Sequence, residues 1–142
     1  MDAIGLTNDY VKTILERYSY NFIGMNKLAK KLHTKANFST VHNVDGHFIA
    51  IIAHRGEIEY FDPIGLPPLS RKIRRFLATD RRNIYVNSKT IQHPMSVFCG
   101  FFVILKVLAV EKSPETKLIS FNSKYLERND NICVLNIIKL MK

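Results

Sequence analysis

Residues 47–63 read HFIAIIAHRGEIEYFDP, and the apolar residues, glycine and proline of this stretch predict a specific local fold. Two apolar runs within it, 47–53 and 58–61, are rich in isoleucine and aromatic residues and predict two β-strands. The connection His54–Gly56 ends in glycine, which is typical of a hairpin with a bulge. The dipeptide Asp62-Pro63 ends the second strand, because proline has no N–H to donate to a continuing ladder. The stretch therefore predicts an antiparallel hairpin.

Apolar spacing on either side of the hairpin predicts the remaining elements. Helices are expected from Thr7 or Asn8 onward, over 25–32, after Pro67-Pro68, over 97–109 and from Asn129 onward. Strands are expected over 38–43, 83–86 and 118–121. The apolar side of the first helix is formed by Tyr10, Val11, Ile14, Leu15 and Tyr18, and that of the helix after the prolines by Leu69, Ile73, Phe76 and Leu77. The mixed order, without a repeat or linker, predicts one α+β domain over residues 1–142.

The composition is that of a globular protein, with 46% hydrophobic and 23% charged residues. The formal net charge of +9 favours polyanions as partners. No leader-like segment opens the chain, and the longest apolar run, 97–105, is too short to span a bilayer. The two cysteines, Cys99 and Cys133, have no CxxC spacing, so neither a disulfide framework nor a metal site is indicated. We expect a soluble intracellular protein without a metal and without a membrane partner.

Four side chains of the kinds used in thiol chemistry follow in the chain order His47, Asp62, Gln92, Cys99. The cysteine lies in the first turn of the apolar helix predicted over 97–109, and the start of a helix favours a thiolate. An imidazole can take the thiol proton, a carboxylate can orient the imidazole, and an amide can donate to an oxyanion beside the Cys99 N–H. These are the working parts of a cysteine protease.

The hairpin itself predicts that His47 and Asp62 meet. With residues 54 and 55 at its tip, residues 47 and 62 are directly opposed on the two strands. Opposed Cβ atoms lie about 4.5–5.5 Å apart, which lets a carboxylate hold a ring nitrogen.

Each of the four residues also has a simpler interpretation. A cysteine at the start of an apolar helix is commonly a small buried hydrophobe, and an aspartate before proline is a common turn former. A histidine at a strand end and a single glutamine are commonly surface residues. Taken singly, these interpretations are favoured; the four types together, in one order and at suitable structural positions, favour the protease.

Three segments carry a resemblance to a known family. They are 44–51 (VDGHFIAI), 60–66 (YFDPIGL) and 91–102, in which Gln92 and Cys99 stand seven residues apart. The chain resembles the adenovirus-type (adenain-like) cysteine proteases, within the wider clan of SUMO and ubiquitin-like proteases. With further similarity at Asn21–Gly24 and Asn129-Asp130, the resemblance runs from about Leu6 to Ile138. Asp62 stands where adenoviral enzymes have glutamate and the SUMO proteases have aspartate.

This resemblance implies a papain-like core, in which helices pack on a small mixed sheet and the nucleophile begins a buried helix. It implies an endopeptidase that cleaves viral precursor proteins of the capsid or core during virion maturation, after glycine or other small residues. It assigns catalysis to Cys99, His47, Asp62 and Gln92. The expected location is the virion and the host cell nucleus.

The stretch 71–82 is strongly basic. Its basic residues are Arg71, Lys72, Arg74, Arg75, Arg81 and Arg82. The simplest interpretation is a solvated helix face. Because adenoviral enzymes use DNA as a cofactor, the resemblance implies a second interpretation, in which these residues contact DNA as an activator. The chemistry itself requires no cofactor.

Two other functions remain open. A protease that removes a ubiquitin-like modifier from host proteins would use the same residues and the same preference for small residues. A basic DNA-binding or capsid-associated protein with an inert site would keep the charge without the catalysis. The presence of all four residue types argues against the inert protein.

Overall fold

The computed structural model describes residues 7–28, 37–80, 82–87, 90, 99–112, 129 and 135. The described strands are β1 (Phe22–Met25), β2 (Phe38–Val44), β3 (His47–His54), β4 (Glu57–Phe61) and β5 (Asn83–Val86). The described helices are α1 (Asn8–Tyr18), α2 (Arg71–Thr79) and α3 (Cys99–Lys112). The α+β class predicted from the sequence is confirmed.

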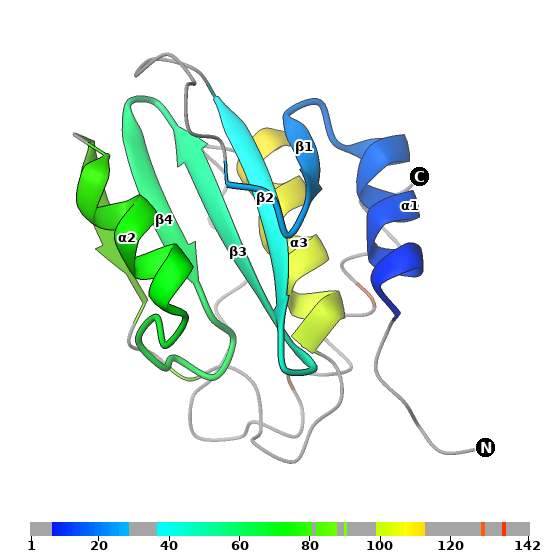
Figure 1. Cartoon of the computed structure of the whole chain (residues 1–142). Coiled ribbons are helices and arrows are strands. Elements are labelled where there is room, and N and C mark those ends of the chain that lie inside the picture. The colour runs from blue at the N-terminus through cyan, green and yellow to red at the C-terminus, as the bar shows by residue number, and fades with distance from the viewer. Residues whose placement is uncertain are drawn as a thin grey trace.

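The strands form one mixed sheet in the order β1-β2-β3-β4-β5 (Figure 1). Strands β2, β3 and β4 are an antiparallel meander, and β1 and β5 are added parallel at its two edges. The connections of the meander are two-residue turns at Asp45-Gly46 and Arg55-Gly56, and all four residues have φ between +52° and +87°. Such turns match the twist of the two strands that they join.

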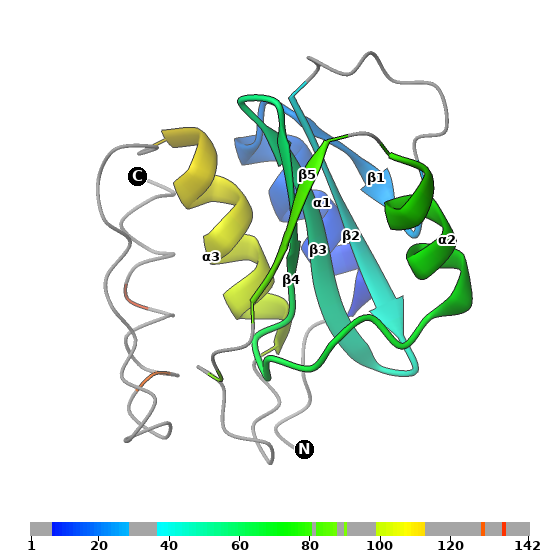
Figure 2. The same cartoon turned by 90° about the vertical axis from the view of Figure 1, so that its left-hand side faces the viewer.

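The central strand β3 is buried on both faces. Its residues Phe48–Ala53 are all buried, and their side chains alternate between two hydrophobic clusters. Phe48, Ala50 and Ile52 pack with α1 and α3, whereas Ile49, Ile51 and Ala53 pack with α2. The molecule therefore has three layers, with α1 and α3 on one side of the sheet and α2 on the other (Figure 2).

Capping side chains fix where the first two helices begin. The Thr7 hydroxyl accepts a hydrogen bond from the Tyr10 N–H at 3.2 Å, and the Ser70 hydroxyl accepts one from the Ile73 N–H at 3.3 Å. Thr7 is therefore the N-cap of α1, as the sequence allowed. Leu69 lies before α2 and is 68% exposed, so it does not belong to the apolar face as predicted.

Polar contacts hold α3 against its neighbours. Lys106 Nζ lies 3.1 Å from a Glu59 carboxylate oxygen on β4, and the Lys106 ammonium also stacks over the Phe61 ring. Near the other end of α3, the Glu111 carboxylate accepts hydrogen bonds from the Ser19 hydroxyl and the Tyr20 N–H, just after α1. These contacts set the position of the helix that carries Cys99.

The remaining sequence predictions differ in outcome. The helix expected over 25–32 is wrong at its start, because Met25 ends β1, which pairs with β2. Tyr10 is 49% exposed rather than in the core. The strand expected over 118–121 lies outside the described residues, as does the helix from Asn129 apart from Asn129 and Leu135. In the described ranges, no helix combines the length and the apolar character needed to cross a bilayer.

A buried histidine makes the stability of this fold sensitive to acid. His42 is 5% exposed in β2, its Nε2 lies 2.9 Å from the Thr40 hydroxyl, and burial lowers its pKa from 6.5 to about 4. Above pH 6.5 the ring is neutral in both folded and unfolded chains. Between pH 6.5 and 4 only the unfolded chain takes up the proton, so the free energy of unfolding falls by about 1.4 kcal/mol per pH unit.

We predict that His42→Gln, which keeps a polar group without a titrating ring, removes about 3 kcal/mol of acid-induced destabilisation. The measurement is urea unfolding of wild type and variant at several pH values between 7 and 4. Contributions from all other groups cancel in the difference between the two proteins. Parallel stability curves for the two proteins would show that His42 does not produce the effect.

Candidate active site

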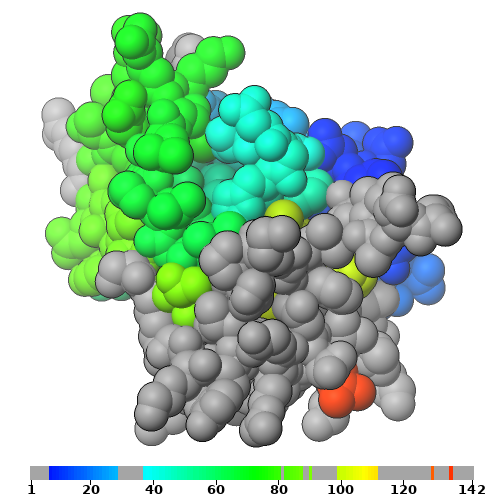
Figure 3. Space-filling model, turned by 90° about the horizontal axis from the view of Figure 1, so that it is seen from below, coloured from blue at the N-terminus to red at the C-terminus, as the bar shows by residue number. Residues whose placement is uncertain are grey.

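Three segments that are far apart in sequence meet at one end of the sheet. His47 is the first residue of β3, Asp62 directly follows β4, and Cys99 is the first residue of α3. Figure 1 shows the start of β3, the end of β4 and the start of α3 at the same lower end of the molecule. Seen from this end, the β2–β3 hairpin (cyan) lies between α1 (blue) and the segment around α2 (green), with small parts of α3 (yellow) visible (Figure 3).

The turn before His47 is held by asparagine side chains. Asn43 Oδ1 accepts the Gly46 N–H at 2.7 Å, and Asn43 Nδ2 donates to Asn8 Oδ1 on α1 at 2.7 Å. Asp45 and Gly46 both adopt positive φ, the conformation for which an Asp-Gly pair is suited. The start of β3, and with it the His47 backbone, is fixed by this turn.

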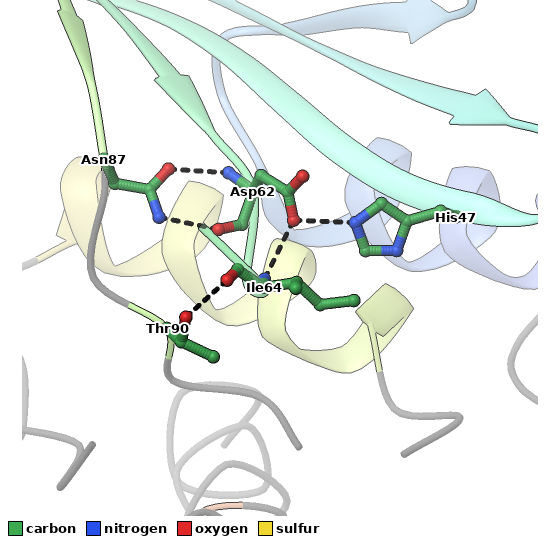
Figure 4. Close-up of polar contacts among 5 residues, drawn as sticks. All are labelled: His47, Asp62, Ile64, Asn87 and Thr90. Atoms are coloured by element: carbon green, nitrogen blue, oxygen red, sulfur yellow. Dashed lines mark hydrogen bonds and ion pairs between the residues drawn. The ribbon is translucent and has the colours of Figure 1, made fainter. Parts of the chain in front are cut away.

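The Asp62 carboxylate is buried and fully oriented. Its side chain is 3% exposed, and one of its oxygens, Oδ1, accepts the Ile64 N–H at 2.8 Å and meets Nε2 of His47 at 2.7 Å (Figure 4). A further bond from the Gly65 N–H to the Asp62 carbonyl at 2.9 Å closes the turn. A carboxylate held from two directions in this way gives the imidazole a fixed partner.

The predicted meeting of His47 and Asp62 is found, but the predicted register is wrong. The hairpin tip is Arg55-Gly56 rather than residues 54 and 55, and the ladder ends at the pair Ala50–Phe61. Arg55 occupies a positive φ, where its N–H donates to the Asn37 side chain at 3.1 Å. The pairing is offset by two residues from the expected one, and an even offset leaves each side chain on its expected face.

His47 holds its proton strongly. Its hydrogen bond with Asp62 is the largest cause, and a hydrogen bond with Cys99 adds to it; together they outweigh burial and raise the His47 pKa to about 9. Because Asp62 uses Nε2, the ring nitrogen left for the sulfur is Nδ1. One imidazole therefore bridges the carboxylate and the thiol.

Cys99 responds in the opposite direction. Burial of the thiol raises its pKa, but the hydrogen bond with His47, the backbone groups of Phe48 and Gly100 and the charge on His47 together lower it below the ordinary value of a thiol. The position at the start of α3 acts in the same direction, since a helix N-terminus favours an anion. The raised pKa of His47 and the lowered pKa of Cys99 both favour a thiolate beside an imidazolium.

The other residues singled out in the sequence have different positions. Gln92 and Arg81 lie outside the described residues. Arg71, Lys72, Arg74 and Arg75 are exposed on α2. Arg82 is 8% exposed, with its guanidinium over the Phe38 ring and its Nε 3.8 Å from Asp80. This burial argues against Arg82 as a contact to DNA.

Two asparagines of the site were missed by the sequence prediction. Asn43 stands two residues before Asp45-Gly46, and this dipeptide is a strong hairpin signal that would have placed His47 at a turn. Asn87 holds the Asp62 main chain from the segment after β5 (Figure 4). A single asparagine after a strand gives no local signal of such a contact.

Comparisons with models of known protein families and with curated proteins found no match. Among the described residues, no group of three or more histidine, cysteine, aspartate or glutamate side chains is placed to hold a metal ion.

We predict that alkylation of Cys99 by iodoacetamide, followed in a Cys133→Ala protein that leaves Cys99 as its single thiol, has its pH midpoint below that of an ordinary thiol. Adding His47→Ala should raise this midpoint, because the hydrogen bond and the charge of His47 no longer oppose burial. His54→Ala, at the opposite end of β3, is the matched control and should leave the midpoint unchanged. Equal midpoints with and without His47 would contradict an activated thiol.

Proposed function

We propose that this chain is a cysteine endopeptidase with a papain-like catalytic core. The observation that supports it is one imidazole, His47, which is bonded through Nε2 to a buried carboxylate at 2.7 Å and bonded also to the Cys99 thiol. A thiol and an orienting carboxylate that both interact with one imidazole are the arrangement that covalent acyl transfer needs. Structural ion pairs also perturb pKa values, but they do not need a thiol at the start of a helix.

In the first step, the Cys99 thiolate attacks the carbonyl carbon of the scissile peptide bond. The carbonyl electrons move to its oxygen, and the resulting tetrahedral oxyanion collapses as the C–N bond breaks. The leaving amine takes the proton from Nδ1 of the His47 imidazolium, and a thioester remains on Cys99. In the second step, neutral His47 takes a proton from water, which attacks the thioester and releases the carboxylic acid product and the thiolate.

Asp62 keeps the imidazole in the orientation that both steps use. Its bond to Nε2 leaves Nδ1 available to the sulfur and stabilises the imidazolium. For the oxyanion we propose two donors, the Cys99 backbone N–H at the start of α3 and the Gln92 side-chain amide. The first turn of a helix has N–H groups without intrahelical partners, which suits this role.

The resemblance to adenovirus-type proteases supports a more specific proposal for substrate and place. The substrates would be viral capsid or core precursor proteins, cut after glycine or another small residue, in the virion or the host nucleus. The rival is removal of a ubiquitin-like modifier, which uses the same chemistry on a different partner.

We predict that the full chain, incubated with candidate precursor proteins, produces new termini that follow small residues, as read by mass spectrometry. Cys99→Ala should abolish these termini while the protein remains folded, and Cys133→Ala is the matched control that should retain them. Gln92→Ala should lower kcat about 10²–10³-fold with little change in KM, because the donor acts on the oxyanion rather than on the bound substrate.

Three results would redirect the proposal. Strong labelling by a modifier-based probe, without precursor cleavage, would favour the modifier protease. A rise in KM alone for Gln92→Ala would make this residue a substrate contact. A folded wild type that neither cleaves nor is labelled would favour the inert basic protein.

The exposed face of α2 supports a second proposal, a binding surface for DNA. Arg71, Lys72, Arg74 and Arg75 lie opposite the buried Ile73 and Leu77, and no carboxylate among the described residues is within ion-pair distance of these four. Helix α2 lies across the sheet from α3 (Figure 2). DNA bound there would therefore act on the site through the sheet or by bringing enzyme and substrate together, not by touching Cys99.

We predict that duplex affinity falls steeply with salt, with a logarithmic slope of about −0.9 per phosphate neutralised. The double variant Arg71→Glu with Arg75→Glu should flatten this slope and leave peptide cleavage without DNA unchanged. The matched control, Lys12→Glu with Lys27→Glu, makes the same change in net charge at exposed positions outside α2. If both double variants have the wild-type slope, or lose affinity equally, the α2 face is only a solvated surface.

A further inference from the structure

The main chain of Asp62 is held by the side chain of one residue, Asn87. The Asp62 N–H donates to Asn87 Oδ1 at 2.7 Å, and Asn87 Nδ2 donates to the Asp62 carbonyl oxygen at 2.6 Å (Figure 4). Both backbone polar groups of Asp62 are thus bonded to a single primary amide. Asn87 itself is only partly buried, whereas the residue that it holds is 2% exposed.

This clamp stands where the sheet can no longer provide one. The parallel pairing of β4 with β5 ends at the pair Tyr60–Val86, followed by a long bond of 3.4 Å from the Asn87 N–H to the Tyr60 carbonyl. At Asp62, the first residue after β4, the Asn87 side chain presents a donor and an acceptor, as the main chain of a neighbouring strand would. Pro63 cannot extend the ladder because it has no N–H.

Fixing this backbone fixes the carboxylate. An aspartate side chain has two rotatable bonds, and here Oδ1 is already tied to the Ile64 N–H two residues on. With the Asp62 main chain clamped, the carboxylate has one direction in which to meet His47. A shift of the backbone by a few tenths of an ångström would lengthen the 2.7 Å bond to Nε2, and charge-assisted hydrogen bonds weaken quickly with distance.

We propose that Asn87 is a positioning residue of the active site, which acts on the His47 imidazole through the backbone of Asp62. This inference rests on the proposed function for its catalytic meaning, although the contacts themselves do not. Asn87 touches neither the substrate nor the sulfur in this role. Its effect is to keep the base protonated and oriented toward Cys99.

The test is an NMR titration of the His47 ring nitrogens in wild type, Asn87→Ala, Asp62→Asn and the double variant. Asn87→Ala should lower the His47 midpoint from its raised value by about one unit, a tenfold change in the ionisation equilibrium. In the Asp62→Asn background, Asn87→Ala should change the midpoint no further, because the residue acts through the carboxylate. On substrate, kcat should fall while KM stays the same.

Thr90→Val is the matched control, because it removes a comparable bond, from the Thr90 hydroxyl to the Ile64 carbonyl at 2.6 Å, without touching Asp62. It should leave the His47 midpoint at its wild-type value. Thermal unfolding identifies variants that do not fold; if Asn87→Ala is among them, Asn87→Ser, whose hydroxyl is too short to bond both backbone groups, takes its place.

A folded Asn87 variant with the wild-type midpoint would overturn the proposal. So would an equal shift in the presence and absence of the Asp62 carboxylate, since Asn87 would then act by another route. The titration uses no substrate, so it separates the two claims. A shifted midpoint in a protein that cleaves nothing would refute the protease and support the positioning role of Asn87. Cleavage with an unshifted midpoint would support the protease and refute the positioning role.

Discussion

The whole arrangement depends on burying β3 on both of its faces. A strand with six consecutive buried residues, Phe48–Ala53, cannot lie at the surface of a two-layer protein, so it needs a cover on each side. Helices α1 and α3 provide one cover and α2 the other. A strand of this kind can present a reactive polar group only at its ends, and His47 is at one end. The apolar helix α3 likewise has Cys99 at its end, as its first residue.

The charged groups at this end depend on one another. A buried carboxylate without partners is strongly destabilising, and Asp62 avoids this through the Ile64 N–H and the His47 ring. The carboxylate raises the pKa of the ring, and the ring lowers the pKa of the thiol. Removing Asp62 would therefore lower the pKa of His47, and removing His47 would raise the pKa of Cys99, so the site behaves as one electrostatic unit.

How far the sequence predicts this structure depends on how local each signal is. The composition of β3 and of α3, the Asp62-Pro63 stop and the Thr7 cap are local, and each places an element within a few residues. The register of the β3–β4 hairpin depended on Arg55 adopting a positive φ, which a residue other than glycine rarely does.

Strand β1 exists because it pairs with β2, and the Asn87 clamp exists because β5 lies beside β4. Such contacts arise from tertiary pairing, so the local spacing of apolar residues does not predict them. Arg82 is a further example, because its basic neighbours in the sequence do not predict that its guanidinium lies over the Phe38 ring.

The candidate site also spans the boundary between the sheet and a helical layer, so the distance between its imidazole and its thiol depends on how the two layers pack. His47 and Asp62 are fixed to the sheet, whereas Cys99 is fixed to α3, so the bond between ring and sulfur is only as well placed as the packing of helix on sheet. That packing is set by the apolar cluster of Phe102 and Ile52 and by the Lys106–Glu59 ion pair between α3 and β4. A displacement of about 1 Å between catalytic groups is enough to cost a hundredfold in rate. In the proposed enzyme, close packing at the helix–sheet interface would therefore contribute to catalysis, because rigid cores resist the gradual sliding that would separate thiol from imidazole.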